Sequence, residues 1–344
     1  MSSKGKVSIV TIGESLGLSF STVSKALNDD PRIKKSTKER VLAKAAELGY
    51  TPNAMAKNLR QNKTNTISVI FNDLENPILT SIFGTISNKM APDYITTISD
   101  SRFDPELEKA HILNALANRS DIILIEPTIK DDKNLLLLKN HTGKVIVFGV
   151  AHDEISCSSV IIDYKFGGYI SAKEMLDKGH TKCAVFGTQL YFPPFTEFIK
   201  GISQAYTEAG IDFDSSLVYG MNSSSEEAFQ QTCQLFERSV NERPTGIITF
   251  CDILALGVFK AAKLYNFNIP NDISVIGHDD YPLSEYTKPE LTTIHLPKKK
   301  IAKNCINIIK NILNENKSTI QVFSSEPVLM RRESISNLRL TKVE

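Results

Sequence analysis

From residue 66 to residue 280 of the 344-residue chain, short apolar runs alternate with stretches whose apolar residues follow helical spacing. Typical runs are TISVIF, DIILIEP, KVIVFGV, KCAVFGT and GIITF. Strands this apolar are buried on both faces, which indicates parallel sheets covered by helices. About ten such units are too many for one ordinary open sheet of this length, so two doubly wound α/β lobes are the simplest arrangement.

The cleft between two such lobes is the expected ligand site, because the carboxyl ends of the strands meet there. A hydrophobic share of 41% and a charged share of 23% are typical of a soluble globular protein. No apolar run reaches the roughly 18 residues of a membrane span, and MSSKGKVSIV lacks the apolar core of a signal peptide. Five scattered cysteines without a CxxC pair indicate reduced thiols. We therefore expect a cytoplasmic protein with no membrane partner.

Residues 8–28 have the pattern of two short helices joined by a tight turn. SIVTIGESL has apolar residues at helical spacing, Gly17 follows it, and Ser19 is a good N-cap for a second helix. In that helix Val23, Ala26 and Leu27 share one face. The opposite face is predicted to present Phe20, Ser21, Thr22, Ser24, Lys25 and Asn28. Such a helix-turn-helix can enter the major groove of DNA; the alternative is an ordinary helical hairpin within a core.

A third helix is expected over Lys35–Leu48, with Gly49 ending it. Its apolar residues Val41, Leu42, Ala45 and Leu48 are predicted to close a three-helix core. Behind it, AMAKNLR is a run of good helix formers too short to be stable alone, and QNKTN is typical of a linker. Residues 1–64 carry 12 Lys and Arg against 5 Asp and Glu, whereas the remaining residues carry 28 against 34. A basic head on an acidic body indicates that the head meets a polyanion.

Seven segments, in their order and spacing, resemble the LacI/GalR family of bacterial transcription repressors over nearly the whole chain. They are STVSKALN, TKERVLAKAAELGYTPNAMAKNLR, DKGHTKCAVFG, DILALG, PNDISVIGHDD, PELTTIHLP and RRES. The resemblance implies a helix-turn-helix headpiece over 1–50, a hinge helix and linker over 51–64, and a body like a periplasmic sugar-binding protein over 65–344. The body would have an N-lobe of 65–163 plus 296–325 and a C-lobe of 164–295 plus 326–344, with crossovers near Asp163–Phe166, Ile294–Pro297 and Ser324–Val328.

The same resemblance implies which headpiece residues contact DNA. Phe20, Ser21 and Lys25 match positions that read base edges, and the Lys25 ammonium can reach O6 and N7 of guanine. Positions that contact phosphates are matched by Ser8, Ser19, Thr22, Ser24, Asn28, Tyr50 and Asn53. The alternative for each serine is a solvated surface residue or a simple helix cap.

The hinge segment carries Ala56, Leu59 and Arg60, which match minor-groove positions of the family. Two copies of Leu59 in a dimer would wedge one base step and kink the duplex, while Arg60 adds a cation in the narrowed groove. The alternative for Leu59 is packing between hinge and body. One departure is Gly13, where the family usually has Ala; it lowers helix propensity by up to about 1 kcal/mol and would leave the headpiece loose until DNA binds.

The effector site departs further from the family. Asp279 matches the effector-binding carboxylate, with capping of the loop before Tyr281 as the alternative. The arginine, asparagine and aromatic pair common in the family are replaced by Phe198, Cys251 and Ile78 with Leu79, and the loop LYFPPFTEF adds Phe192 and further aromatics. The cleft is therefore expected to be unusually apolar. Either it accepts an apolar or aromatic-faced ligand anchored by Asp279, or the phenylalanines fill it.

Two classes of function follow. The first is a homodimeric repressor that binds a pseudo-palindromic double-stranded DNA operator and answers to an unidentified small-molecule effector, or, with a filled cleft, to a protein partner or to none. The second is a ligand-binding module or enzyme with an inactive headpiece. No nucleophile elbow, phosphate-cradling glycine-rich loop or metal-spaced histidine cluster occurs, so no catalytic residue, metal or cofactor is expected. The basic headpiece and the missing signal peptide favour the regulator.

Overall fold

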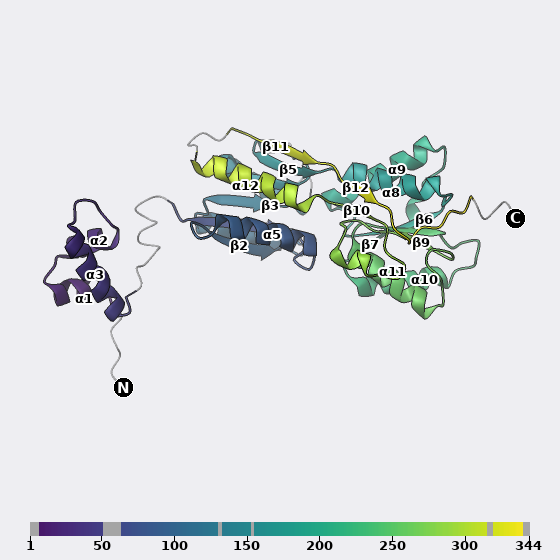
Figure 1. Cartoon of the computed structure of the whole chain (residues 1–344). Helices are drawn as coiled ribbons and strands as arrows, with labels where there is room; N and C mark the ends of the chain where they lie inside the picture. The colour runs from purple at the N-terminus through teal and green to yellow at the C-terminus, as the bar shows by residue number, and fades with distance from the viewer. Residues whose placement is uncertain (1–6, 51–62, 130–132, 153–154, 315–318, 340–344) are drawn as a thin grey trace. The chain divides into compact units, whose positions relative to one another are not determined.

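The computed structural model describes residues 7–50, 63–129, 133–152, 155–314 and 319–339. It divides the chain into two compact units, Met1–Thr64 and Asn65–Glu344, of which the first is all helical and the second is α/β (Figure 1). Among the described helices, none is long and apolar enough to cross a membrane.

The N-terminal unit is a bundle of three helices, α1 (Ile9–Leu16), α2 (Phe20–Leu27) and α3 (Lys35–Glu47). Gly17 ends α1 in the left-handed conformation, with φ 66°, which allows the tight turn into α2. The buried core is formed by Ile12, Val23, Ala26, Val41 and Ala45. The three-helix core is thus confirmed, but Leu42 is wrong as a core residue: its side chain is 53% exposed. It follows Val41 directly, and adjacent helical residues point about 100° apart.

Gly13 is buried where α1 meets the turn. A Cβ at this position would lie 2.7 Å from the backbone oxygen of Leu18, and the Leu18 amide donates to the Gly13 oxygen at 2.9 Å. The glycine therefore allows a close approach of the two backbone segments, a reason that its low helix propensity alone did not indicate.

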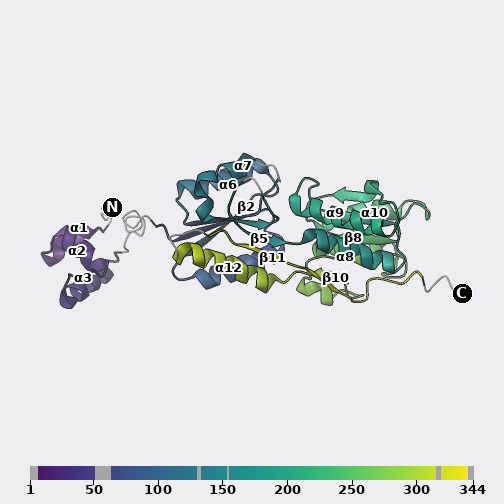
Figure 2. The same ribbon diagram turned by 90° about the horizontal axis from the view of Figure 1, so that it is seen from above.

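The N-lobe of the second unit is built on six parallel strands in the order β11-β5-β4-β3-β1-β2. In chain order these strands are β1 (Thr66–Phe71), β2 (Ile95–Asp100), β3 (Ile122–Ile125), β4 (Val145–Gly149), β5 (Ser158–Ile162) and β11 (Val322–Ser325). Helices α5 (Pro77–Met90) and α12 (Lys298–Asn314) cover one face, and α6 (Pro105–Ala117) and α7 (Lys133–Leu136) cover the other (Figure 2). Both faces are buried, as the apolar runs predict.

The C-lobe has four parallel strands in the order β7-β6-β8-β9. They are β6 (Cys183–Gly187), β7 (Val218–Gly220), β8 (Gly246–Thr249) and β9 (Ser274–Ile276). Alternate residues of β6 face opposite cores: Cys183 and Val185 face α8 (Tyr164–Asp177) and α9 (Pro193–Glu208), while Ala184 and Phe186 face α10 (Ser225–Phe236) and α11 (Asp252–Leu264). Three short 3₁₀ helices complete the described elements, η1 (Lys139–Lys144), η2 (Ser215–Leu217) and η3 (Pro282–Glu285).

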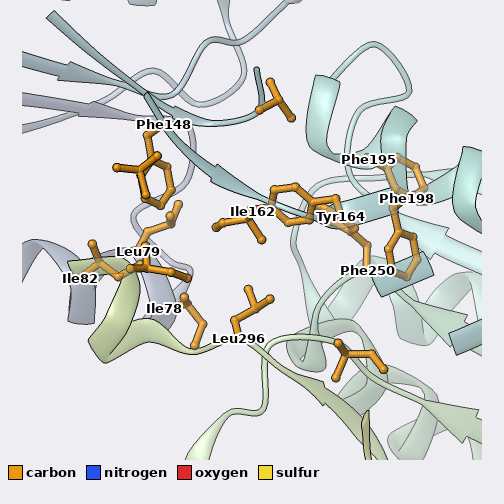
Figure 3. Packing of buried hydrophobic residues seen from close by; sticks show 14 of the residues in the cluster. Ile78, Leu79, Ile82, Phe148, Ile162, Tyr164, Phe195, Phe198, Phe250 and Leu296 are labelled. Atoms are coloured by element: carbon orange, nitrogen blue, oxygen red, sulfur yellow. The ribbon is translucent and has the colours of Figure 1, made fainter. Parts of the chain in front are cut away.

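The chain passes between the two sheets at three places. It leaves β5 at Asp163, whose carboxylate caps α8 by accepting from the Phe166 amide at 2.8 Å. It returns between β10 (Thr293–His295) and α12, and leaves again between β11 and β12 (Val328–Met330). Strands β10 and β12 pair antiparallel, and one apolar core continues from the N-lobe into the C-lobe past Ile162 and Tyr164 (Figure 3).

Close packing of α8 on α9 depends on two glycines. A Cβ at Gly201 of α9 would overlap the backbone oxygen of Lys165, and one at Gly168 of α8 would overlap the backbone oxygen of Phe198. Each helix therefore approaches the other at backbone distance, which sets the position of the Phe198 segment under the cleft.

We predict that Gly201→Ala lowers the free energy of unfolding of the body by about 1–3 kcal/mol, because two backbone segments must separate to admit one methyl group. The matched control is Gly84→Ala in α5, where an added Cβ meets nothing within 4 Å. That variant should instead gain about 0.5–1 kcal/mol from helix propensity. Urea denaturation of both variants checks the pair, and equal effects would contradict this account of the α8–α9 contact.

Candidate functional site

The outward face of α2 is the candidate DNA-binding surface. Phe20 is 52% exposed, Ser21 and Asn28 are exposed, and Thr22 and Lys25 are half-buried. Ser24 is the exception to the predicted face, because it is only 6% exposed. It lies next to Val23 on the side of the helix that turns toward the core, so it is wrong as an outward residue.

Several predicted phosphate contacts also stabilise the headpiece. The hydroxyls of Ser8 and Ser19 cap α1 and α2, accepting from the Thr11 amide at 3.3 Å and from the Thr22 amide at 3.2 Å. The Asn28 side-chain amide donates to the Ser24 backbone oxygen at 2.7 Å. Tyr50 is half-buried against the three-helix core. The capping alternative therefore holds for Ser8 and Ser19, and a cap leaves the exposed hydroxyl free to accept or donate further.

The hinge residues of the sequence analysis, Ala56, Leu59 and Arg60, and the predicted phosphate contact Asn53 lie outside the described residues. Their roles stay predictions from the sequence.

A narrow cleft lies between the two lobes at the carboxyl ends of their strands. The space between its atoms is about 470 Å³ with open solvent included, of which about 30 Å³ is a cavity that admits water-sized spheres. Five of the six predicted effector residues line it: Ile78, Leu79, Phe192, Cys251 and Asp279. Figure 3 shows Ile78, Leu79, Ile162 and Leu296 on one side of this region and Tyr164 and Phe250 on the other.

Phe198 is wrong as a cavity residue. It is fully buried behind the wall, with its ring 5.3 Å from those of Phe250 and His278, both edge to face. Phe195 packs on Phe250 in a tilted arrangement, at 5.2 Å. These rings belong to the C-lobe core beneath the cavity and do not fill it.

Asp279 holds a strained position at the end of β9. Its backbone has φ 111°, where a side chain other than glycine is rare, and only 4% of the residue is exposed. One carboxylate oxygen lies 3.1 Å from Nδ1 of His278, and the other accepts from the Asn76 amide of the N-lobe at 3.4 Å. The turn at Tyr281 is capped by Asp252 instead, whose carboxylate accepts from the Tyr281 amide at 2.8 Å. Asp279 is therefore directed at the cavity and is not the cap of its own loop.

Contacts of the following residue, Asp280, hold the Asp279 backbone in this strained conformation. Asp280 pairs with Arg332 at 2.8 Å and with Nδ1 of His295 at 2.8 Å, and the Asp279 amide donates to the Ile294 oxygen at 2.8 Å. Together these contacts fix the backbone of the loop. They offset the strain of the Asp279 backbone, which costs roughly 1–3 kcal/mol.

Two further acids in the wall were missed by the sequence analysis. Glu126 directly follows β3, and Asp73 lies two residues after the end of β1. The same position at strand ends that singled out Asp279 could have found both acids. Glu126 is 3% exposed, and burial raises its pKa from 4.5 to about 8. Burial also raises the pKa of Asp73 and Asp279 above the ordinary value of 3.8. The remaining wall residues not predicted are Asn76, Phe103, Ile162, Tyr164, Thr188, Ser223, Phe250 and Leu296.

The lobes touch each other across the mouth of the cavity. The Tyr191 hydroxyl donates to the Phe103 backbone oxygen at 2.9 Å, and the rings of Phe103 and Phe192 pack edge to face at 5.0 Å. The backbone of Phe103 has φ 57°, a conformation that is rare for residues with bulky side chains. The contact between the lobes is therefore made by a residue with a strained backbone. Within the described part of the chain, no group of His, Cys, Asp and Glu side chains could hold a metal ion.

Comparison with known proteins gives matches over both units. A family model described as bacterial regulatory proteins, lacI family, matches residues 8–53, and one for a periplasmic binding protein-like domain matches residues 172–335. The HTH-type transcriptional repressor PurR of Aliivibrio fischeri is 27% identical over 331 residues, covering 96% of this chain and 98% of the relative. PurR of Vibrio atlanticus is 28% identical over 324 residues, covering 94% and 96%.

Solved structures show the same fold. A LacI-family regulator from Silicibacter pomeroyi superimposes with a TM-score of 0.84 at 20% identity, covering 96% of this chain and 99% of the other. The lac repressor dimer bound to operator and the anti-inducer ONPF gives 0.79 at 22% identity with the same coverage. A LacI-family regulator from Enterococcus faecium with bound ribose gives 0.70 at 21% identity, covering 79% and 99%.

Stability should fall as the pH rises, because Glu126 binds its proton more tightly in the folded state than in the unfolded chain. The contribution of Glu126 to the free energy of unfolding is fully present below pH 4.5 and is lost as the pH rises through about 8. The raised pKa corresponds to a destabilisation on the order of 5 kcal/mol at high pH. We predict that Glu126→Gln flattens the decline of unfolding free energy over this range, measured by denaturation at a series of pH values.

The matched control for that experiment is Glu106→Gln, whose side chain is 83% exposed at the start of α6. It should leave the pH dependence as in the wild type. A wild-type protein whose stability increases steadily from pH 5 to pH 8 would contradict the burial argument for Glu126.

Proposed function

Since the chain belongs to the lacI family of bacterial regulatory proteins, we propose that it is a sequence-specific DNA-binding repressor of transcription and not an enzyme. Its repression of an operator responds to a small molecule bound between the lobes of its body. The observation that supports DNA binding most directly is α2: a capped helix on a three-helix core that exposes Phe20 and Ser21 with Lys25 beside them.

The chemistry of this helix fits base readout in the major groove. The Lys25 ammonium can donate to O6 and N7 of guanine, and Phe20 can make apolar contact with a thymine methyl group. Ser21 is short and discriminates little. Hydroxyl and amide groups around it (those of Ser8, Ser19, Thr22, Asn28 and Tyr50) are suited to phosphates, which fix the register without reading sequence. Buried Ser24 has no part in this proposal.

We assign the protein a dimer on a pseudo-palindromic operator. The lac repressor was solved as a dimer bound to its operator, and this chain shares its fold over 96% of its length. A two-fold dimer places two copies of α2 on half-sites one helical turn, about 34 Å, apart.

A small-molecule effector is supported by the cavity itself. Phe195 and Phe198 lie beneath the wall, so they do not fill it, and polar groups of both lobes face it. Relatives in fold were solved with ribose and with cellobiose at identities of 21% and 19%, respectively. Because Asn76, Asp279, Phe103 and Phe192 connect the lobes across this space, a ligand that replaces these contacts shifts the balance between lobe arrangements.

Lys25→Ala tests the major-groove assignment. We expect it to relax the preference at one base position per half-site by about 1–3 kcal/mol, measured with a library of operator variants selected by the wild type. The matched control is Lys44→Ala, which removes a lysine of α3 that pairs with Glu47 at 2.7 Å. If Lys25→Ala weakens binding equally to all sequences, Lys25 contacts phosphate only.

Light scattering tests the proposed dimer separately, and a monomer in solution would contradict it.

Leu59→Ala tests the hinge assignment, which rests on the sequence. We expect loss of DNA bending and of specific binding, with salt-sensitive non-specific binding near that of the wild type, because a wedge acts on the base step and not on phosphates. Bending is measured by fluorescence energy transfer between the ends of a labelled operator. A Leu59→Ala protein that bends the operator normally would remove Leu59 from the minor groove.

A further inference from the structure

The acids of the cavity wall come from three separate strands and meet at one place. Asp73 follows β1, Glu126 follows β3 and Asp279 follows β9, and all three line the cavity. Asp73 and Asp279 each raise the pKa of Glu126 by charge repulsion, in addition to burial. Ionised carboxylates that repel one another are unfavourable together unless one of them is protonated or a cation lies among them.

The described wall supplies little positive charge. None of the described residues that line the cavity is Lys or Arg. Beyond the wall, His278 and the Lys298 ammonium at the start of α12 favour the ionised form of Asp279, whereas Asp100 acts against ionisation of Asp73. The charges of Asp73 and Glu126, when these acids ionise, are therefore not compensated by any Lys or Arg among the described wall residues.

The rest of the wall is suited to a cation with an apolar frame. Tyr164 and Phe250 lie side by side with ring centroids 5.6 Å apart, and Phe103 and Phe192 pack at 5.0 Å (Figure 3 shows the first pair). The faces of such rings attract ammonium groups by about 0.5–2 kcal/mol, more where water is excluded. Ile78, Leu79 and Leu296 leave apolar surface for the carbon frame of a ligand.

A separate observation points to a ligand in the same place. Thr188 follows β6, lines the cavity and is only 2% exposed, yet its hydroxyl has no hydrogen-bond partner among the described residues. A buried hydroxyl without a partner is unfavourable by about 1–3 kcal/mol, and a polar ligand group in the cavity would supply the missing bond.

We propose that the cavity binds a small protonated amine carried on an apolar or aromatic frame. The ammonium donates to the carboxylate of Asp279 and is attracted by the charges of Asp73 and Glu126, the rings of Tyr164 and Phe250 lie beside it, and the Thr188 hydroxyl bonds to a polar group of the frame. Anionic ligands such as sugar phosphates are repelled. The proposal rests on the assignment of this cavity as the effector site and specifies its ligand class.

Matched pairs of probes test it by isothermal titration calorimetry with the full chain: 2-phenylethylamine against 2-phenylethanol, and cyclohexylamine against cyclohexanol. We expect each amine to bind at least tenfold more tightly than its alcohol at neutral pH. Tighter or equal binding of the alcohols, binding of D-ribose or D-glucose in preference to the amines, or no binding of either amine at millimolar concentration overturns the proposal.

Two variants of the wall and the pH dependence of binding test whether the amine binds beside these acids. Glu126→Gln and Asp73→Asn should each weaken amine binding at least tenfold, whereas Glu106→Gln on the exposed surface should not change it. Binding of a cation favours the ionised acids and releases protons, so the amine affinity should rise between about pH 6 and about pH 8, at most tenfold per pH unit for each proton released. Amine binding that is unchanged by both wall variants contradicts the site.

The same preparations separate this inference from the proposed function. Operator binding is measured by fluorescence anisotropy with and without the amine. Normal operator binding by a protein that binds no amine contradicts the ligand class alone. Amine binding that leaves operator affinity unchanged contradicts regulation through the cavity and leaves the ligand class in place.

Discussion

The body of this protein depends on the burial of two parallel sheets on both faces. Because helices cover both sides of β1, β3 and β6, these strands hold almost only apolar side chains along their length. Polar side chains are then confined to the strand ends, and in a parallel sheet the carboxyl ends all lie at one edge. The two lobes place those edges opposite each other. The concentration of Asp73, Glu126, Thr188 and Asp279 around one cavity is a direct result of that topology.

Burial then changes the chemistry of these groups. A carboxyl at the end of an exposed strand would keep its ordinary pKa, whereas Glu126 is only 3% exposed, with Asn72 as its hydrogen-bond donor, and burial raises its pKa to about 8. The contacts between the lobes around the same cavity are made at strained positions, Phe103 on one lobe and Asp279 on the other. Strain and desolvation at the same place are typical of a site whose arrangement is completed by a ligand.

The N-terminal unit is stabilised by a different balance of interactions because it is small. In its described part, 7–50, the core consists of five buried apolar side chains, so caps and turns carry a larger share of its stability. Ser8, Ser19 and Gly17 serve this purpose, and Gly13 admits the Leu18 carbonyl where any other residue would be too large. The requirements of the fold and of the proposed DNA contacts thus fall on the same residues of α1 and α2. Ser19 is an example, because it caps α2 and is also a proposed phosphate contact.

The sequence by itself determined the class of each part. Helical spacing and capping residues indicated the three helices, and apolar runs indicated two parallel sheets, because these patterns depend on neighbours along the chain. It also indicated Asp279 and four other residues of the cavity wall through the family resemblance. Only the tertiary structure decided which way particular side chains point: Ser24 and Phe198 inward, Leu42 outward. It alone brought Glu126 and Asp73 beside Asp279, because their proximity arises from the packing of one lobe against the other and has no counterpart in local sequence.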